Sequence, residues 1–317
     1  HLLGAARPGS DAARREGVMT QTRYATLLPY VLLLLATLFW SGNNIVARVT
    51  VQEVPPFSLT FWRVALALLM LTPFALPGVI RQWSVIKRHW KMITFIGLLG
   101  VPTFNLFLNS AIQFTTAVNA SLINGGTPAL TVLLGWLIYR EGFGWRMLVG
   151  MVVAFSGITA IVIQGDLGVL RAFSFNPGDL LMLPAIASWA IYTLALRYKP
   201  TDLDGLPFLM VMMVVSMPVL AAFYAVDLAG GRTFALTTNN TISIGYIALF
   251  PALLAFAFWN RGIAALGAAR GVQLQYLMPV WGALGGVFFL TEPFRQYHLV
   301  GIVLIFVGVF LATRRRS

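Results

Sequence analysis

Ten long apolar runs follow one another along this chain, and each of them is ended by proline, glycine or charged residues. Each run has about the 20 residues that an α-helix needs to cross a membrane. The strands of a membrane barrel would be about half as long and would alternate in polarity. The runs therefore predict an all-α integral membrane protein with ten transmembrane helices. We expect these helices at residues 27–48, 57–76, 91–113, 117–139, 145–163, 177–197, 206–226, 242–264, 268–290 and 297–313.

The composition excludes the usual classes of soluble enzyme. Hydrophobic residues make up 58% of the chain and charged residues only 10%, whereas a soluble domain has about 25% charged residues. Cysteine is absent, His1 and His89 lie outside the apolar runs, and His298 lies at the very start of the last one. These residues leave little material for a disulfide, a metal site or a catalytic base within the membrane, so we expect no cofactor, no metal and no catalytic residue.

The basic residues indicate how the chain is oriented. The net charge is +12, but Lys and Arg gather at the ends of the apolar runs, which favours membrane orientation over binding to nucleic acid. With the N-terminus inside, the only span-end basic residues on the outside are Arg48, Arg171, Arg232 and Arg295. We therefore expect an N-in, C-in protein of a bacterial inner membrane. Residues 1–26 form a cytoplasmic tail, of which residues 1–18 are expected to be an upstream extension or a cloning remnant.

An internal repeat divides the apolar part of the chain into two halves. At an offset of 151 residues Pro128 matches Pro279, Asn109 matches Asn260 and Glu141 matches Glu292, while Trp40 matches Trp189 at a slightly shorter offset. The repeat predicts two five-helix units, residues 27–163 and 177–313. Because five is an odd number, the second unit would enter the membrane from the opposite face. Such inverted repeats are typical of secondary transporters.

The layout is similar to that of a known family. Trp40 in the first helix, the segment Phe61-Trp62-Arg63 in the second, and Glu141 and Glu292 at the ends of the fourth and ninth helices resemble the EamA family of the drug/metabolite transporter superfamily. The likeness covers the chain from about Met19 onwards and is greatest to the aromatic amino acid exporters of the YddG type. It implies structural roles for Arg63, Glu141 and Glu292.

Polar residues recur at helical spacing inside the apolar runs, although each of them is costly in hydrocarbon. They therefore face a watery path or one another, and we expect them to bind substrate. The alternative for each single residue is an interhelical hydrogen bond or an interface anchor. The candidate substrate-binding residues are Trp40, Asn43, Asn44, Asn105, Asn109, Asn124, Thr127, Trp189, Tyr192, Trp259, Asn260, Gln275, Tyr276 and Trp281. Helices 2, 5, 7 and 10 have fewer polar groups and are expected to form a supporting outer layer.

Pro128 and Pro279 lie inside the matched fourth and ninth helices. Proline removes a hydrogen bond of the helix, so we expect gating hinges at these two residues. A static kink is the alternative.

The acidic residues narrow the substrate, because none lies near the middle of a span. A proton-coupled exporter of cations ordinarily needs a buried carboxylate. Amides, hydroxyls and indoles instead suit a zwitterionic solute with an apolar or aromatic side chain. We expect facilitated export of amino acids by alternating access, through one chain acting as a monomer in the lipid bilayer. A multidrug exporter and a nucleotide-sugar carrier are the alternatives; an enzyme or a channel is disfavoured.

Overall fold

The computed structural model describes residues 27–43, 46, 53–172, 174, 176–289 and 293–313. Within these ranges the regular elements are all helical, and eight helices are long and apolar enough to cross a membrane. A shorter apolar helix, Leu27–Asn43, precedes them. The prediction of an all-α protein that crosses the membrane several times is confirmed. The predicted residues Asn44, Arg48 and Glu292 lie outside the described residues.

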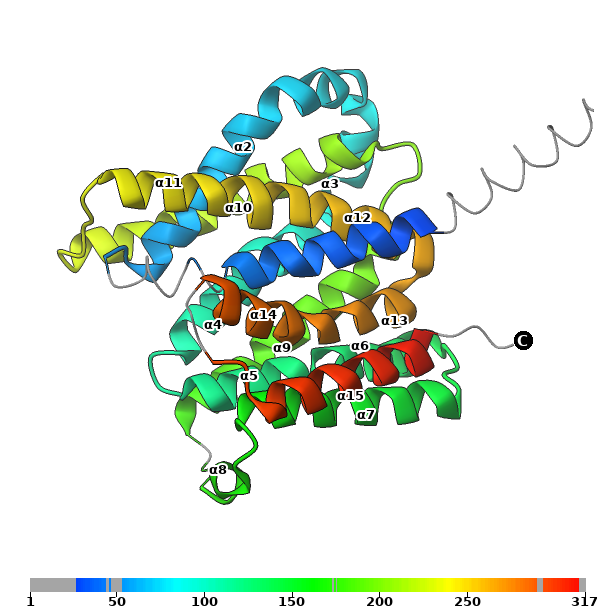
Figure 1. Ribbon diagram of the computed structural model, residues 1–317. Helices are drawn as coiled ribbons and strands as arrows, with labels where there is room; N and C mark the ends of the chain where they lie inside the picture. The colour runs from blue at the N-terminus through cyan, green and yellow to red at the C-terminus, as the bar shows by residue number, and fades with distance from the viewer. Residues whose placement is uncertain are drawn as a thin grey trace, which may run out of the picture.

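The helices pack side by side as one bundle (Figure 1). After the N-terminal helix Leu27–Asn43, the elements in chain order are α2 (Pro56–Arg81), α3 (Trp83–Leu98), the π-helical segment η1 (Leu99–Thr103), α4 (Phe104–Ala111), α5 (Ala117–Gly125), α6 (Thr127–Tyr139), α7 (Trp145–Val162), the short α8 (Leu167–Arg171), α9 (Pro177–Ala195), the 3-10 turn η2 (Leu196–Tyr198), α10 (Gly205–Ala229), α11 (Thr238–Ile247), the π-helical segment η3 (Ala248–Leu254), α12 (Ala255–Leu266), α13 (Ala268–Gly271), the 3-10 segment η4 (Val272–Leu277), α14 (Met278–Phe289) and α15 (Gln296–Thr313).

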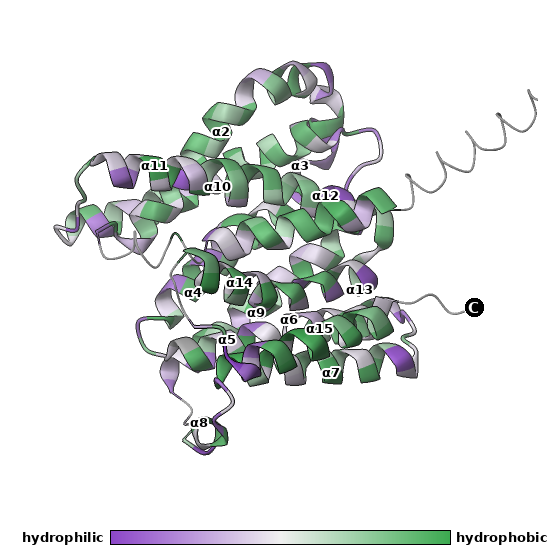
Figure 2. Cartoon of the chain, viewed as in Figure 1, coloured by the Kyte–Doolittle hydropathy of each residue, from purple (hydrophilic) through white to green (hydrophobic). Residues whose placement is uncertain are grey.

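Two helices extend further than the apolar runs that predict them. Helix α2 continues past residue 76 to Arg81, and α3 begins at Trp83 rather than near residue 91. A helix satisfies its own backbone hydrogen bonds, so it continues into the headgroup layer, where charged side chains are tolerated. Apolar content therefore marks the membrane-crossing part of a helix and not its end. Figure 2 shows the resulting hydrophilic residues at the α2–α3 corner.

Two of the long helices are interrupted by a π-helical segment around a proline. Segment η1 contains Pro102 between α3 and α4, and η3 contains Pro251 between α11 and α12. Proline has no N–H to donate and its ring displaces the preceding carbonyl, so the regular hydrogen-bond ladder shifts register there. In both helices the irregular turn is followed by the residues that carry the predicted polar groups.

Helices α7 and α15 make the closest pair in the bundle because glycines line their contact. A Cβ added at Gly150 would lie 2.5 Å from the carbonyl oxygen of Gly308, and one added at Gly157 would lie 2.6 Å from that of Gly301. The first glycine of α7 thus meets the last of α15, so the two helices are antiparallel. Small residues permit this close approach of two backbones.

A second antiparallel pair, α2 and α10, lies on another side of the bundle (Figure 1). Near the start of α2, the backbone N–H and hydroxyl of Ser58 both donate to Oδ2 of Asp227, at 2.9 Å, near the end of α10. Near the other end, a Cβ added at Gly78 would lie 2.6 Å from the ring of Pro207. The N-terminal helix lies between α12 and α14, near the centre of the molecule (Figure 1).

Candidate functional site

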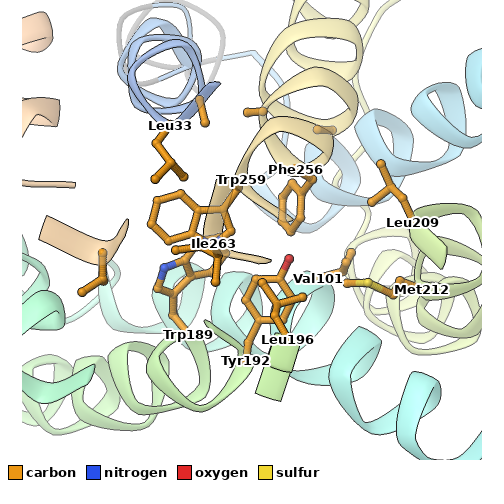
Figure 3. Packing of buried hydrophobic residues seen from close by; sticks show 14 of the residues in the cluster. Leu33, Val101, Trp189, Tyr192, Leu196, Leu209, Met212, Phe256, Trp259 and Ile263 are labelled. Atoms are coloured by element: carbon orange, nitrogen blue, oxygen red, sulfur yellow. The ribbon is translucent and has the colours of Figure 1, made fainter. Parts of the chain in front are cut away.

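Three tryptophans from three helices meet at the centre of the bundle. The rings of Trp40, Trp189 and Trp259 have centroid separations of 5.1, 5.2 and 5.8 Å, and Trp40 and Trp189 meet edge to face. Tyr192 and Phe256 complete this group, which we call the aromatic cluster. Trp259 and Tyr192 are fully buried, so the cluster closes the centre of the molecule (Figure 3).

The polar atoms of the aromatic cluster are only partly satisfied. The indole N–H of Trp40 donates to the carbonyl oxygen of Pro251 at 3.1 Å, and the hydroxyl of Tyr192 donates to Oδ1 of Asn260. The indole nitrogens of Trp189 and Trp259 have no hydrogen-bond partner among the described residues. In Figure 3 the ring nitrogen of Trp189 lies on the side that faces Trp259. Four of the predicted residues, Trp40, Trp189, Tyr192 and Trp259, thus lie together in a packed cluster, and their role in binding substrate stays a prediction.

A cavity of about 850 Å³ lies between helices of both halves of the chain, and its lining includes none of the residues of the aromatic cluster. Six of the predicted residues line it: Asn124, Thr127, Pro128, Gln275, Tyr276 and Pro279. Apart from the Arg295 guanidinium and the His298 imidazole, its polar side chains are amides and hydroxyls. Such groups both donate and accept hydrogen bonds, so they suit a solute that carries ammonium and carboxylate groups together.

Both helices that bring polar groups to the cavity are irregular at the cavity wall. Helix α5 ends at Gly125 and α6 starts at Thr127, while the 3-10 segment η4 gives way to α14 at Met278. The prediction placed Pro128 and Pro279 inside continuous helices. In the structure each is the second residue of a new helical segment, where the absent N–H has no intrahelical partner to lose. A hinge role for the two prolines stays a prediction.

The remaining wall of the cavity comes from α7 and α15, which the sequence assigned to a supporting layer. Ile158 and Ile161 of α7 contribute apolar surface, and Gln164, Arg295 and Tyr297 lie where the cavity reaches the end of these two helices. The outer-layer prediction is therefore wrong for α7 and α15. Polar residues at helical spacing do not reveal α7 and α15 as cavity helices, because most of the wall that α7 supplies is apolar. Their matched glycines were the only signal in the sequence that these two helices meet.

Other predicted residues form contacts between helices away from the cavity. Arg63 of α2 donates to Oδ1 of Asn105, and Nδ2 of Asn109 donates to the hydroxyl of Thr60 at 3.0 Å. The indole N–H of Trp281 donates to the hydroxyl of Thr37, at 3.2 Å. Asn43 ends the described N-terminal helix and is half-buried. For Asn105, Asn109 and Trp281 the geometry matches the interhelical alternative.

At the opposite end of the bundle an ion pair joins two helix ends. Nη1 of Arg197 lies 2.6 Å from Oε1 of Glu141, and the guanidinium of Arg197 stacks 4.2 Å from the ring centroid of Tyr139. A small pocket of about 240 Å³ lies beside this pair, bounded by the α12–α13 turn at Gly267. The large cavity does not include these residues.

Two buried carboxylates serve as helix caps. Asp227 accepts from Ser58 at the start of α2. Asp179 accepts from the backbone N–H of Asn176 in a capping box and from the side chain of Asn119. Both lie near helix ends, away from the large cavity. In the described part of the chain no three His, Cys, Asp or Glu residues gather as metal ligands would.

Comparison with known proteins places the fold in a transporter family. The EamA-like transporter family matches residues 27–163 and 176–314. The uncharacterized transporter YyaM of Bacillus subtilis is 26% identical, covering 90% of this chain and 93% of that protein. A probable terminal-alkyne amino-acid exporter of Streptantibioticus cattleyicolor is 25% identical over 89% and 92%. A crystal structure with 21% identity superposes with a TM-score of 0.74, covering 92% of this chain and 96% of the other. The chain belongs to the EamA-like transporter family, and it is a multi-pass membrane protein of that family of transporters.

Proposed function

We propose that this chain exports small zwitterionic metabolites, aromatic and other apolar amino acids among them, across a bacterial inner membrane. Transport proceeds by alternating access, as facilitated export without obligatory proton coupling. The observation that carries the proposal is the cavity of about 850 Å³, whose polar side chains other than Arg295 and His298 are amides and hydroxyls. A volume of this order accommodates a small-molecule ligand. The resemblance to one named amino-acid exporter, at 25% identity, supports the same class of substrate.

The chemistry of the cavity supports a zwitterion over a permanent cation. Asn124 and Gln275 offer amides, and Thr127 and Tyr276 offer hydroxyls, while the apolar wall of α7 suits an apolar side chain. The buried carboxylates Asp179 and Asp227 are committed to helix caps, so they are poorly placed to exchange a proton for a cation in the cavity. These features favour uncoupled movement down the gradient of the solute.

The proposed architecture is ten spans in two inverted repeats, with both termini inside. The contacts of α2 and α10 support it, because Ser58 contacts Asp227 and Gly78 contacts Pro207. At an offset of 149 residues Ser58 matches Pro207 and Gly78 matches Asp227, so the repeat converts one contact into the other. The contacts of α7 and α15 behave in the same way at an offset of 151, because Gly150 matches Gly301 and Gly157 matches Gly308. Exchange of partners of this kind is what a two-fold axis in the membrane plane would produce.

Alternating access then has a simple physical form in this molecule. The large cavity reaches the end of the bundle at Gln164 and Arg295, which is the predicted outer side. The Glu141–Arg197 ion pair and the aromatic cluster close the other side. Exchange of the roles of the two halves would open the inner end and close the outer one.

The experiment is uptake of labelled phenylalanine and tryptophan into liposomes that contain the purified protein, with neither a pH difference nor a voltage. Saturable uptake that unlabelled amino acids compete away is expected. Protein-dependent flux that requires a pH difference would keep the substrate and overturn the uncoupled mechanism. Absence of amino-acid flux, with flux of a lipophilic cation or a nucleotide sugar, would overturn the substrate and favour the corresponding relative within the superfamily.

A further inference from the structure

The corner between α2 and α3 carries a dense group of positive charges that the transport path does not use. Lys87, Arg88 and Lys91 all lie within one stretch of five residues of α3. All three are exposed, and in the part of the chain that the structure describes none of them has an acidic partner. By contrast, Arg81 at the end of α2 is paired with Asp204 at 2.9 Å. Three uncompensated charges thus remain at one place on the bundle.

Two exposed tryptophans frame these charges. Trp83 and Trp90 are 50% and 55% exposed. Nζ of Lys87 lies 5.8 Å from the ring centroid of Trp83, and Nζ of Lys91 lies 5.9 Å from that of Trp90. Exposed indoles in a membrane protein gather at the level of the lipid headgroups, where the ring contacts acyl chains and the N–H contacts water. The position of the two rings therefore sets the three cations at headgroup depth.

The backbone holds this group in a fixed orientation. Ile86 and Ile93 of α3 are buried, and the helix packs against α10. At His89 the backbone leaves the helical range, with φ −111° and ψ 15°, so the first turns of α3 are set at an angle to the part that crosses the membrane. Trp83 and Lys87 are four residues apart before this break and share one helical face, whereas Trp90 and Lys91 follow it.

We propose that Lys87, Arg88 and Lys91, with Trp83 and Trp90, form a binding site for the phosphate headgroup of an anionic phospholipid of the surrounding leaflet. Ammonium and guanidinium groups donate charge-assisted hydrogen bonds to phosphate oxygens, while the indoles cover the glycerol region. A soluble acidic partner fits less well, because large indoles exposed beside the charges match a lipid surface rather than water. This site is independent of the transported solute.

The absence of cysteine allows a local test on the full-length protein. Ser84→Cys places one thiol on an exposed position of the same corner for a fluorescent label. In nanodiscs of phosphatidylcholine, a small fraction of nitroxide-labelled phosphatidylglycerol is expected to quench this label more than nitroxide-labelled phosphatidylcholine does. Each basic residue near an anionic surface changes partition by about fivefold, so K87Q/R88Q/K91Q should remove most of the preference, and so should high salt.

A matched control separates this site from the general positive field of the inner end. Gly142→Cys is exposed and its added Cβ meets no atom within 4 Å, and its nearest cations in the chain, Arg140 and Arg146, stand on either side of the acidic Glu141. We expect little preference for phosphatidylglycerol at this label. Equal quenching by the two lipids at Ser84→Cys, a preference that survives the triple substitution, or an equal preference at Gly142→Cys would each overturn the proposal. Elution of each variant as the wild-type particle on size exclusion excludes misfolding as the cause.

Discussion

Tyr192 illustrates how a single side chain ties the aromatic cluster to the helix that faces it. Its ring is fully buried and its hydroxyl donates to Asn260, whose own Nδ2 has no partner among the described residues. Burial without a hydrogen bond is costly for such groups. The pair therefore holds α9 against α12 in the closed centre of the molecule.

Tyr192→Phe is expected to lower the free energy of unfolding by about 1–3 kcal/mol, because Asn260 would be left buried without its donor. Chemical denaturation of the detergent-solubilised protein measures this change. Tyr224→Phe is the matched control, since Tyr224 is half-buried and stacks on Phe61 through its ring. Equal stability of the two variants would contradict the role assigned to the Tyr192 hydroxyl.

Asn124 belongs to the cavity instead, and its removal should affect transport more than folding. In Asn124→Ala we expect uptake of labelled amino acid to fall several-fold, with the free energy of unfolding within about 0.5 kcal/mol of wild type. Uptake and denaturation are measured on the same preparation. Asn109→Ala, which removes a hydrogen bond to Thr60 away from the cavity, should show the reverse pattern.

At the scale of the helices, irregular turns occur at matched places in the two halves of the chain. The π-helical segments at Pro102 and Pro251 and the interruptions before Pro128 and Pro279 give both halves the same two irregular helices. Prolines in an apolar run indicate that a helix is disturbed. They do not indicate whether it bends, shifts register or restarts, because that depends on the neighbouring backbone.

The glycine contact between α7 and α15 makes a prediction at the same scale. Gly157→Leu should separate the two helices and cost about 1–3 kcal/mol, because even a Cβ there lies 2.6 Å from the carbonyl oxygen of Gly301. A shift in thermal unfolding of the purified protein reports the loss. Gly245→Ala in α11 meets no atom within 4 Å, so it should leave the unfolding temperature close to that of wild type. An unchanged Gly157→Leu protein would show that the helices are free to separate.

For the whole molecule, the Glu141–Arg197 ion pair connects the segments that follow α6 and α9, at the end of the bundle that the proposed mechanism closes. Glu141→Arg places like charges there and should change the uptake rate by up to about fivefold, the range expected for an exposed pair. The double variant Glu141→Arg with Arg197→Glu restores opposite charges and should restore the rate. If the double variant were as impaired as the single one, the ion pair would have no part in the closure.

The sequence predicted the membrane class and most of the helix positions. The length of an apolar run depends only on local composition. The match between residues such as Pro128 and Pro279 depends only on the repeat, so both features are visible in the sequence. The division of the polar residues into a closed cluster and a cavity was not predictable. An asparagine that bonds Thr60 and one that lines a cavity have the same spacing along a helix, and only the packing of distant helices distinguishes them. The apolar wall of α7 was not predictable either, because the packing of distant helices decides which apolar residues line the cavity.

The paired glycines of α7 and α15 also restrict how the two halves of this gene are free to diverge. Gly150 meets Gly308 and Gly157 meets Gly301. In the repeat Gly308 corresponds to Gly157 and Gly301 corresponds to Gly150, so each glycine of α7 contacts the residue that corresponds to the other glycine of α7. A larger residue that arises by mutation in one half collides with backbone of the other half, and no change of a single partner side chain relieves a clash with a carbonyl oxygen. Random drift after duplication is therefore expected to be slowest along these two helix faces, even where neighbouring residues exchange freely.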